Sequence, residues 1–234
     1  MSAAEGSVRQ PADPFRTGSV YTATQAARLA GTSPQTVNNW LRGYEGDGHH
    51  MEPVFGGKPR ADGRPVRVSF LQLAEIIVVA RFRHLGVRLQ RLRAAHRFAR
   101  EAFGLPYPFA SLKLTSAGGH VLHSFDERFP GQMLALDTGG RQWTLPGIVT
   151  RELERFEYEG DPWVLRWFPE GRACPIVIDP HVSGGLPTIA KTGVSVTIVQ
   201  KRFTAGESID DIANDFELAR ADIEVALRYA AKAA

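Results

Sequence analysis

The 234-residue sequence has a single cysteine, Cys174, and no long hydrophobic run. One thiol cannot form an intrachain disulfide and has no second thiol for a structural metal site, so we expect Cys174 to be a small buried residue. The longest apolar stretch, around residues 76–80, is far too short to cross a bilayer, and no charged-then-apolar leader opens the sequence. We therefore expect a folded cytoplasmic protein.

Patterns typical of metal sites and enzymes are scarce as well. His49 and His50 are adjacent, so on a strand they would point to opposite sides. The same difficulty holds for His120 and His123 in "HVLHSF". The stretch "GGKPR" lacks the Lys-Ser/Thr end of a phosphate-binding loop, and no nucleophile with a base and an orienting group is visible. We predict no metal, no cofactor and no catalytic site.

Four glutamates lie near a candidate helix in the middle of the chain, at Glu152, Glu154, Glu157 and Glu159. A role in acid–base chemistry would require a pocket and perturbed pKa values. We interpret these side chains as a solvated face.

Acidic residues are sparse between residues 58 and 100, where the only two are Asp62 and Glu75. The basic residues of this block are Lys58, Arg60, Arg64, Arg67, Arg81, Arg83, Arg88, Arg91, Arg93, Arg97 and Arg100. Such a block favours a polyanionic partner, and a solvated helix face is the alternative. The last thirty or so residues, in contrast, run acidic.

Two short helices are predicted near the N-terminus, after a mobile tail at residues 1–20. In "YTATQAARLAG", Thr22 caps the first helix with Gln25 in a capping box, and Gly31 ends it. In "TSPQTVNNWLRG", Ser33 caps the second helix and Pro34 suits its first position.

The second of these helices has two distinct faces. Val37, Trp40 and Leu41 share one face, because they are spaced three and four residues apart. The other face is polar and holds Gln35, Thr36, Asn38, Asn39 and Arg42.

Further elements follow from turn and capping signals. "GGKPRADGRPVRV", residues 56–68, has an Asp-Gly turn between basic arms and suits a hairpin. Ser69 caps a helix that runs to about Leu85, and after Gly86 a second helix runs to Phe103. The stretches "ASLKLTS", "HVLHSF", "QMLALDTGGRQWTL" and "PWVLRWF" are predicted strands, with a helix between Pro146 and Tyr158.

The C-terminal part returns to helices, over Ser195–Thr204, after the cap Ser208, and from about Arg220. The step from Ala27 to Val37 equals the step from Ala213 to Ile223, so a second helix-turn-helix unit is plausible. We predict an α+β fold: an N-terminal winged helix-turn-helix at 21–104, a mixed β/α middle region at 105–172 and a C-terminal three-helix, helix-turn-helix-like domain at 173–234.

Charge distinguishes the two units. Between residues 21 and 44 the charged residues are Arg28 and Arg42, with no acid. Residues 206–228 carry two arginines against Glu207, Asp210, Asp211, Asp215, Glu217, Asp222 and Glu224. Because a duplex repels an acidic surface, we assign DNA to the first unit and protein contacts to the second.

The first unit also has side chains suited to reading bases. Asn and Gln can bond adenine edges, Arg can bond guanine, and Thr can meet a thymine methyl. The predicted DNA-binding set is Ser33, Gln35, Thr36, Asn38, Asn39 and Arg42 on the helix, with Lys58, Arg60, Arg64 and Arg67 on phosphates. An ordinary polar surface helix is the alternative.

Residues 21–103, with "YTATQAARLAGTSPQTVNNWL", a basic hairpin and "FRHLGVRLQRLRAA", resemble the winged helix-turn-helix of MerR-type regulators. No long dimerising coiled coil follows, so the ligand sensing of those regulators is not carried over.

Residues 177–231 resemble a small bacterial domain found in VapB-type antitoxins, through the Ile-Asp-Pro start at 178–180, Gly185, Pro187, Gly206 and Ser208. Members commonly have Gly-Thr-Arg where this chain has Lys191, Thr192 and Gly193. The resemblance implies an antitoxin of a VapBC module that binds operator DNA and a PIN-type ribonuclease toxin. We also expect a homodimer, because one helix-turn-helix has a small footprint and the acidic, apolar-backed C-terminal helices are available for pairing.

A toxin of that type has an acidic, Mg²⁺-binding active site, so the inhibiting contact is expected from a basic residue. The candidates are Lys191, Lys201 and Arg202. Two alternatives remain open: a stand-alone transcriptional regulator and an enzyme carried by the middle region.

Overall fold

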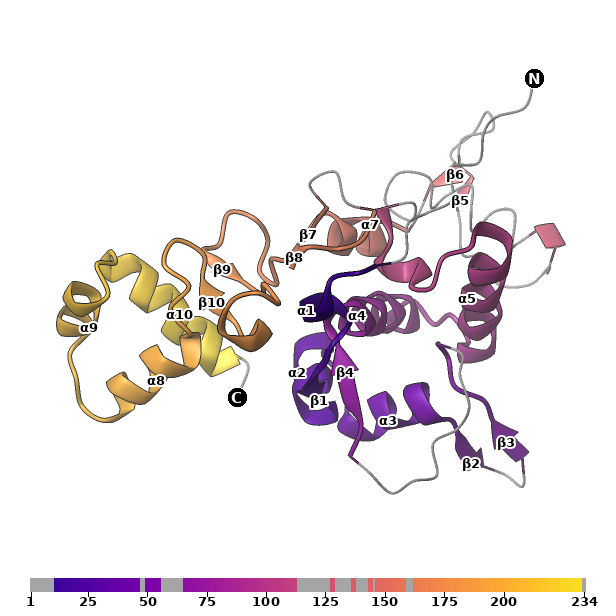
Figure 1. The fold of residues 1–234 in the computed structure, drawn as a ribbon, viewed down its shortest axis with the longest axis horizontal. Coiled ribbons are helices and arrows are strands. Elements are labelled where there is room, and N and C mark those ends of the chain that lie inside the picture. The colour runs from indigo at the N-terminus through magenta and orange to yellow at the C-terminus, as the bar shows by residue number, and fades with distance from the viewer. Residues whose placement is uncertain are drawn as a thin grey trace. The chain divides into compact units, whose positions relative to one another are not determined.

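The computed structural model describes residues 11–46, 49–55, 65–112, 127–128, 136–137, 143–144, 146–158 and 162–232. The chain divides into two compact units, and the ribbon diagram of Figure 1 draws both. The first comprises Met1–Leu153 and Gly160–Val164, and the second comprises Glu154–Glu159 and Leu165–Ala234. Residues of the predicted middle region are therefore divided between the two units.

The first unit begins with a short helix and a strand. These are α1 (Pro14–Thr17) and β1 (Ser19–Thr22). The Asp13 side chain caps α1 by accepting from the Phe15 N–H at 2.9 Å, and it pairs with Arg16, which is buried. The prediction of a mobile tail was therefore wrong for residues 14–20, because a capping aspartate and its ion pair order them.

The next two helices form where the caps predicted them. Helix α2 (Ala23–Ala30) begins with the complete Thr22–Gln25 capping box and ends at Gly31, whose φ is 67°. Helix α3 (Pro34–Arg42) begins at Ser33, whose hydroxyl accepts from the Thr36 N–H at 3.1 Å. Both capping predictions are confirmed.

Two longer helices form the centre of the first unit. Helix α4 (Phe70–His84) is capped by Ser69 in a second capping box and is buried along most of its length. Since α4 is apolar on nearly every side, other elements must cover it all round. Helix α5 (Leu89–Phe103) contacts it through His96 and Glu75, and the 3₁₀ turn η1 (Pro108–Ala110) packs on both helices. The predicted cap at Ser69 is confirmed.

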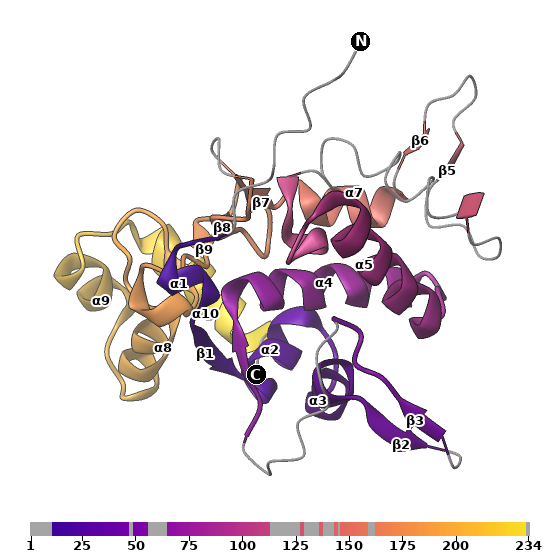
Figure 2. The same ribbon diagram turned by 45° about the vertical axis from the view of Figure 1, so that its right-hand side comes forward.

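One strand pair in this unit was not predicted. Strand β4 (Arg67–Ser69) pairs with β1, with Tyr21 opposite Val68. Burial favours this pairing, because Tyr21 and Val68 are at most 1% exposed. Most of the hairpin predicted over residues 56–68 lies outside the described residues, and a hairpin that was not predicted joins β2 (Tyr44–Gly46) and β3 (His49–Met51), directly after α3 (Figure 2).

The middle of the chain is only partly described. Strands β5 (Leu136–Asp137) and β6 (Trp143–Thr144) pair antiparallel, within the predicted stretch "QMLALDTGGRQWTL". The strand predicted at "HVLHSF" and most of "ASLKLTS" lie outside the described residues. Helix α7 (Gly147–Leu153) is shorter than predicted, because β7 (Phe156–Glu157) pairs with β8 (Arg166–Trp167) and buries the Phe156 ring near Trp167.

The glutamates of this region are not one solvated face. Glu152 is 3% exposed and accepts from Arg81 Nε at 2.8 Å, and Glu157 is 8% exposed. The prediction was wrong for these two, because arginines offset the cost of burying their charge. Glu154 is exposed as predicted, whereas Glu159 lies outside the described residues.

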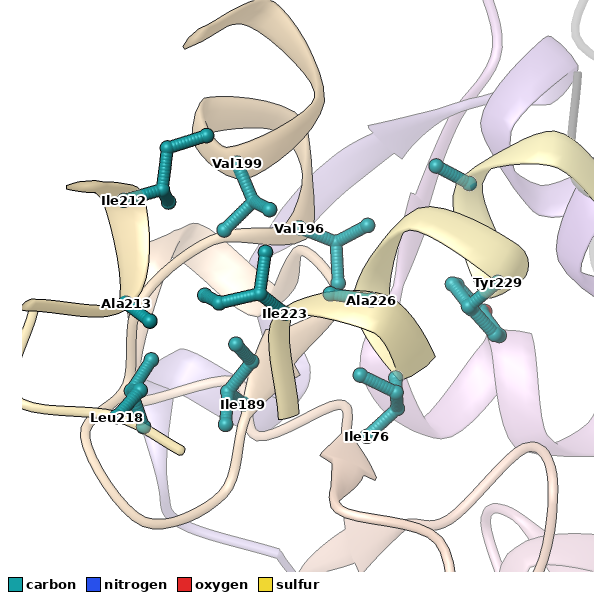
Figure 3. Packing of buried hydrophobic residues seen from close by; sticks show 11 residues of the cluster. Ile176, Ile189, Val196, Val199, Ile212, Ala213, Leu218, Ile223, Ala226 and Tyr229 are labelled. Atoms are coloured by element: carbon teal, nitrogen blue, oxygen red, sulfur yellow. The ribbon is translucent and has the colours of Figure 1, made fainter. Parts of the chain in front are cut away.

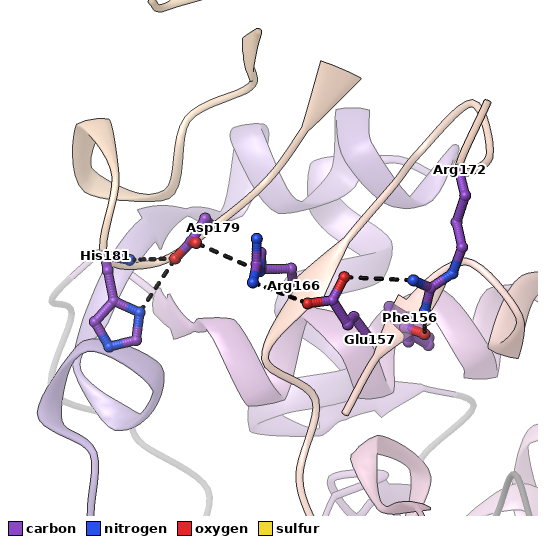
Figure 4. Close-up of polar contacts among 6 residues, drawn as sticks. All are labelled: Phe156, Glu157, Arg166, Arg172, Asp179 and His181. Carbon is purple, nitrogen blue, oxygen red and sulfur yellow. Dashed lines mark hydrogen bonds and ion pairs between the residues drawn. The ribbon is translucent and has the colours of Figure 1, made fainter. Parts of the chain in front are cut away.

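In the second unit, Glu157 belongs to a chain of alternating charges that Figure 4 shows. Its carboxylate lies 3.0 Å from Arg166 and 3.3 Å from Arg172. Arg166 also lies 3.8 Å from Asp179, which accepts from the His181 backbone N–H at 2.8 Å. These contacts fix the β7–β8 hairpin to the Ile-Asp-Pro segment at 178–180.

Three helices and a small sheet complete the second unit. Strands β9 (Ile176–Val177) and β10 (Thr188–Ile189) pair antiparallel around the 3₁₀ turn η2 (Ser183–Gly185). The helices α8 (Val196–Thr204), α9 (Ile209–Asp215) and α10 (Arg220–Lys232) follow. The predicted cap at Ser208 is confirmed, since its side chain accepts a backbone N–H, and Ser195 caps α8 in the same way.

The core of this unit lies between these helices and the β9–β10 sheet (Figure 3). Ile189, Val199, Ile212 and Ile223 are all 0% exposed there. Cys174, expected to be buried, is half-buried against the same core. Among the residues described, no helix is long and apolar enough to span a membrane.

The predicted repeat of a helix-turn-helix is also present. The Thr32 N–H donates to the Ala27 carbonyl at 2.9 Å, and the Leu218 N–H donates to the Ala213 carbonyl at 2.9 Å. Residues 31 and 217 stand at the same place in the two turns and both have positive φ. The backbone therefore turns in the same way between α2 and α3 and between α9 and α10.

Candidate nucleic-acid interface

Helix α3 is held in place by its apolar side. Val37 is 0% exposed and Trp40 is 5% exposed, whereas Leu41 is only half-buried. Against them lies α2, whose buried Ala26, Ala27 and Ala30 are small enough to let the two helices approach closely. This packing leaves the opposite side of α3 facing outward.

The predicted base-reading residues share that outward side. Gln35 is exposed, and Thr36, Asn38 and Asn39 are partly exposed, as is Arg42. Gln35 Nε2 donates to Asn39 Oδ1 at 2.8 Å, and Asn38 Nδ2 donates to the Pro34 carbonyl at 3.0 Å. Both bonds are exposed, so a base edge could replace them at little cost.

Two arginines on the elements next to α3, β4 and α2, carry exposed positive charge. Arg28 on α2 is exposed, and Arg67 on β4 is exposed with its guanidinium 3.4 Å from the Val20 carbonyl. The other predicted phosphate contacts, Lys58, Arg60 and Arg64, lie outside the described residues. The flanks of their segment are fixed, since Phe55 is 7% exposed and Arg67 belongs to β4.

The β2–β3 hairpin, which follows α3 directly, carries an acid and a histidine. Glu45 and His50 face each other across it, with Glu45 Oε1 2.6 Å from His50 Nδ1. It therefore lacks the arginines expected of a phosphate-binding wing. Sequence reasoning missed this hairpin, although the Asp-Gly pair at 47–48 is a turn signal of the same kind as the one used at 62–63.

Part of the basic block serves the fold. Arg81 pairs with Glu152, and Arg83 donates to the Val87 carbonyl at 2.7 Å. A second group on α5 contacts residues 52–55: Arg93, Arg97 and Arg100. The block is therefore neither a uniform anion-binding surface nor a solvated helix face.

In the second unit, the three predicted toxin-binding cations have different surroundings. Lys191 and Lys201 are exposed and form no ion pair within the described part of the chain. Arg202 instead pairs with Glu207 and Asp215, and these hydrogen bonds raise its pKa above the ordinary value. Its guanidinium also lies 5.1 Å from the centre of the Phe216 ring.

Acids of the second helix-turn-helix are partly neutralised in the same way. Arg220 lies 2.7 Å from Asp210 and 3.0 Å from Glu224. Asp211 accepts from the Ser208 hydroxyl at 2.6 Å, and Asp222 accepts from the Ala219 N–H at 3.3 Å. At the positions of Thr36 and Asn38 on α3, α10 has the acids Asp222 and Glu224. In the described residues, no group of three or more histidine, cysteine or acidic side chains could hold a metal ion.

Comparison with protein families matches each unit separately. A family described as "Putative DNA-binding HTH domain" matches residues 19–96, which include α2, α3 and the described strands β2, β3 and β4. A family described as "Protein of unknown function (DUF433)" matches residues 176–230, from β9 into α10. The first of these matches coincides with the helix-turn-helix that α2 and α3 form.

Two proteins of Mycobacterium tuberculosis (strain ATCC 25618 / H37Rv) are similar along most of the chain. One, named "Putative antitoxin VapB45", is 27% identical over 211 residues, which cover 84% of this chain and 87% of the relative. The other, "Uncharacterized protein Rv2308", is 28% identical over 228 residues, covering 91% and 90%.

A solved structure has the same fold. It is the X-ray crystal structure of Rv2018 from Mycobacterium tuberculosis, with a TM-score of 0.74 and 26% sequence identity. The similarity covers 91% of this chain and 99% of that one. The combination of an N-terminal helix-turn-helix and a DUF433 segment therefore has a distant homologue that is named an antitoxin.

Proposed function

We propose that this protein is an antitoxin that binds and neutralises a PIN-type ribonuclease toxin and represses its own operator. The observation that carries the proposal is the similarity to the relative named VapB45, which spans both units. The surfaces support a division of labour, with DNA on the first unit and the toxin on the second. Both roles are binding roles, and we propose no catalytic step.

The DNA-binding role rests on the polar side of α3. Asn39 and Gln35 carry amides suited to adenine, and Arg42 can bond guanine. Arg67, together with Lys58, Arg60 and Arg64, supplies positive charge for phosphates. One such helix reads a short site, so we propose a homodimer on two inverted half-sites.

An operator-binding titration with point variants tests this role. Asn39→Ala or Arg42→Ala should cost about 1–3 kcal/mol on the operator and reduce discrimination between sequences. Arg64→Ala should weaken binding to all sequences alike and flatten the salt slope by about one unit. Arg228→Ala is the matched control, because Arg228 holds on α10 the position that Arg42 holds on α3. Equal losses for Arg42→Ala and Arg228→Ala would remove the assignment to α3.

The toxin-binding role is proposed for the surface of α8 and the turn before it. Lys201 lies on α8 near Ile198, which is 48% exposed, and Lys191 lies in the turn after β10. An exposed lysine beside exposed apolar area suits an interface that ends in an acidic active site. Arg202 is less suited, because its pairs with Glu207 and Asp215 would have to break.

Co-expression with the toxin from the neighbouring reading frame tests this surface. Wild type should rescue growth, and Lys201→Glu combined with Lys191→Glu should not, because both charges would then repel the toxin's carboxylates. Arg228→Glu makes on α10 the same charge change as one of these two lysine substitutions, and it should still rescue. Rescue by the lysine variant would move the toxin-binding surface elsewhere.

A stand-alone transcriptional regulator is the second candidate function. It shares the DNA-binding surface and is favoured by the match to a DNA-binding domain that names no toxin. The neighbouring reading frame separates the two. A small frame with the spaced acidic residues of a PIN-type ribonuclease supports the antitoxin, and operator binding without such a frame supports the regulator.

A further inference from the structure

Residues 52–55 follow the β2–β3 hairpin and lie outside helices and strands, and all of them except the exposed Glu52 are buried. Pro53, Val54 and Phe55 are all buried. A buried segment outside helices and sheets must find partners for its backbone groups elsewhere. The partners here come from two helices, α3 and α5.

Three contacts tie this segment to those helices through its backbone. The Val54 N–H donates to the Trp40 carbonyl at 2.7 Å, at the C-terminal end of α3. Arg93 Nε donates to the Pro53 carbonyl and Arg100 Nη1 donates to the Phe55 carbonyl, each at 3.2 Å. The two arginines thus satisfy the two carbonyl groups that flank Val54.

Two side-chain contacts strengthen the same connection. Arg97 lies 2.8 Å from Glu52, and the His96 ring lies edge-on to Phe55 with centroids 5.5 Å apart. These α5 contact residues are spaced three, four and seven positions after Arg93, so they share one face.

Helix α5 is itself fixed at this point to the centre of the unit. His96 Nε2 lies 3.0 Å from Glu75 Oε1, and both side chains are 1% exposed. Glu75 also accepts from the Phe109 N–H at 3.2 Å. This face of α5 therefore connects the buried His96–Glu75 pair to the C-terminal end of α3.

We propose that Arg93, Arg97 and Arg100 are positioning residues for the DNA interface and do not themselves hold phosphates. They fix residues 52–55, and through the Val54–Trp40 hydrogen bond the end of α3. Arg93 is partly buried, and this burial lowers its pKa from the ordinary value. The inference rests on the DNA-binding role proposed above.

A charge swap at the exposed pair tests it, because Glu52 and Arg97 are 63% and 60% exposed and tolerate substitution. The probe is the DNA upstream of the gene, titrated with full-length protein at several salt concentrations. Arg97→Glu should weaken binding about fivefold, the most that an exposed ion pair is expected to contribute. Glu52→Arg together with Arg97→Glu should restore wild-type affinity. A phosphate contact at Arg97 would in addition flatten the salt slope of Arg97→Gln by about one unit, whereas the ion pair predicts an unchanged slope.

The salt slope gives a second readout. Arg93→Gln and Arg100→Gln should weaken binding with an unchanged slope, whereas the control Arg67→Gln should flatten it by about one unit. Failure of the charge swap to restore binding, or a flatter slope for Arg93→Gln and Arg100→Gln, would overturn the positioning role alone. Absence of salt-dependent binding by the wild type would overturn the DNA-binding role as well.

Discussion

Residues 22–43 and residues 208–229 follow one structural plan at a constant offset along the chain. Thr22 corresponds to Ser208 as the cap of the first helix, and Ala27 corresponds to Ala213 as the carbonyl that closes the turn. The surfaces differ completely, because the first segment has no acid and the second has acids on both helices. Backbone geometry alone therefore does not indicate which partner a helix-turn-helix binds.

The two segments also differ in how they treat their charges. On α3 the amides of Gln35 and Asn39 bond each other at the surface, which leaves their hydrogen bonds replaceable. On α9 and α10 the acids are paired within the unit, through Arg202 and Arg220. A ligand could therefore replace the amide hydrogen bond on α3, whereas the acids bound by Arg202 and Arg220 already have partners within their own unit.

The largest effect is expected from the buried positions that correspond in the two segments, Val37 and Ile223, both 0% exposed. Ile223→Ala should lower the free energy of unfolding of the second unit by about 2–4 kcal/mol, and Val37→Ala should destabilise the first unit by less, since fewer methyl groups are lost. Thermal unfolding measures both changes. Operator binding should fall only for Val37→Ala, and toxin neutralisation only for Ile223→Ala. Equal loss of operator binding in both variants would show that the functions are not divided.

A smaller effect is expected where the two turns take positive φ. Gly31 has φ 67° and open space around it, and Glu217 has φ 53°. Only the backbone conformation disfavours a side chain there, so Gly31→Glu should destabilise the first unit by about 1 kcal/mol. Glu217→Gly should raise the stability of the second unit by up to about 1 kcal/mol.

Chemical denaturation measures both of these changes. Glu217→Asn is the control for the lost charge, because asparagine also tolerates this conformation. Destabilisation by both Glu217→Gly and Glu217→Asn would show that the Glu217 side chain stabilises the turn and that the two turns are not equivalent.

Local signals made these segments predictable from sequence. Caps at Thr22, Ser33, Ser69 and Ser208 state where a helix begins, and each acts within a few residues. Strand pairing was less predictable, since Arg67–Ser69 could pair with a neighbour or with β1, and only burial of Tyr21 against Val68 decides it. The pairing of β4 with β1 was not predicted for that reason.

The candidate site shows the same limit. The residues on α3 could be placed from helical periodicity, because it is local. The roles of Arg93 and Arg100 could not, since their partners lie about forty residues earlier and are backbone carbonyls, which no sequence pattern marks. The number of arginines in the sequence therefore did not distinguish positioning residues from exposed surface charges. Glu152 and Glu157 were misassigned for the same reason, because their arginine partners are set by the tertiary fold.

The smallest effect is expected at Tyr229, where the first segment has Gly43 at the corresponding position. Tyr229 is buried in the core of the second unit, and burial raises its pKa above the ordinary value of 10, with Glu170 and Cys174 adding to the shift. The neutral phenol is therefore favoured by folding, and its contribution to stability is complete below about pH 10 and declines above it. Denaturation between about pH 9 and about pH 11 should show the second unit losing stability in the wild type and losing less in Tyr229→Phe. Identical losses of stability in both proteins would show that the Tyr229 phenol ionises in the folded state without cost. The core around α10 would then admit water at Tyr229.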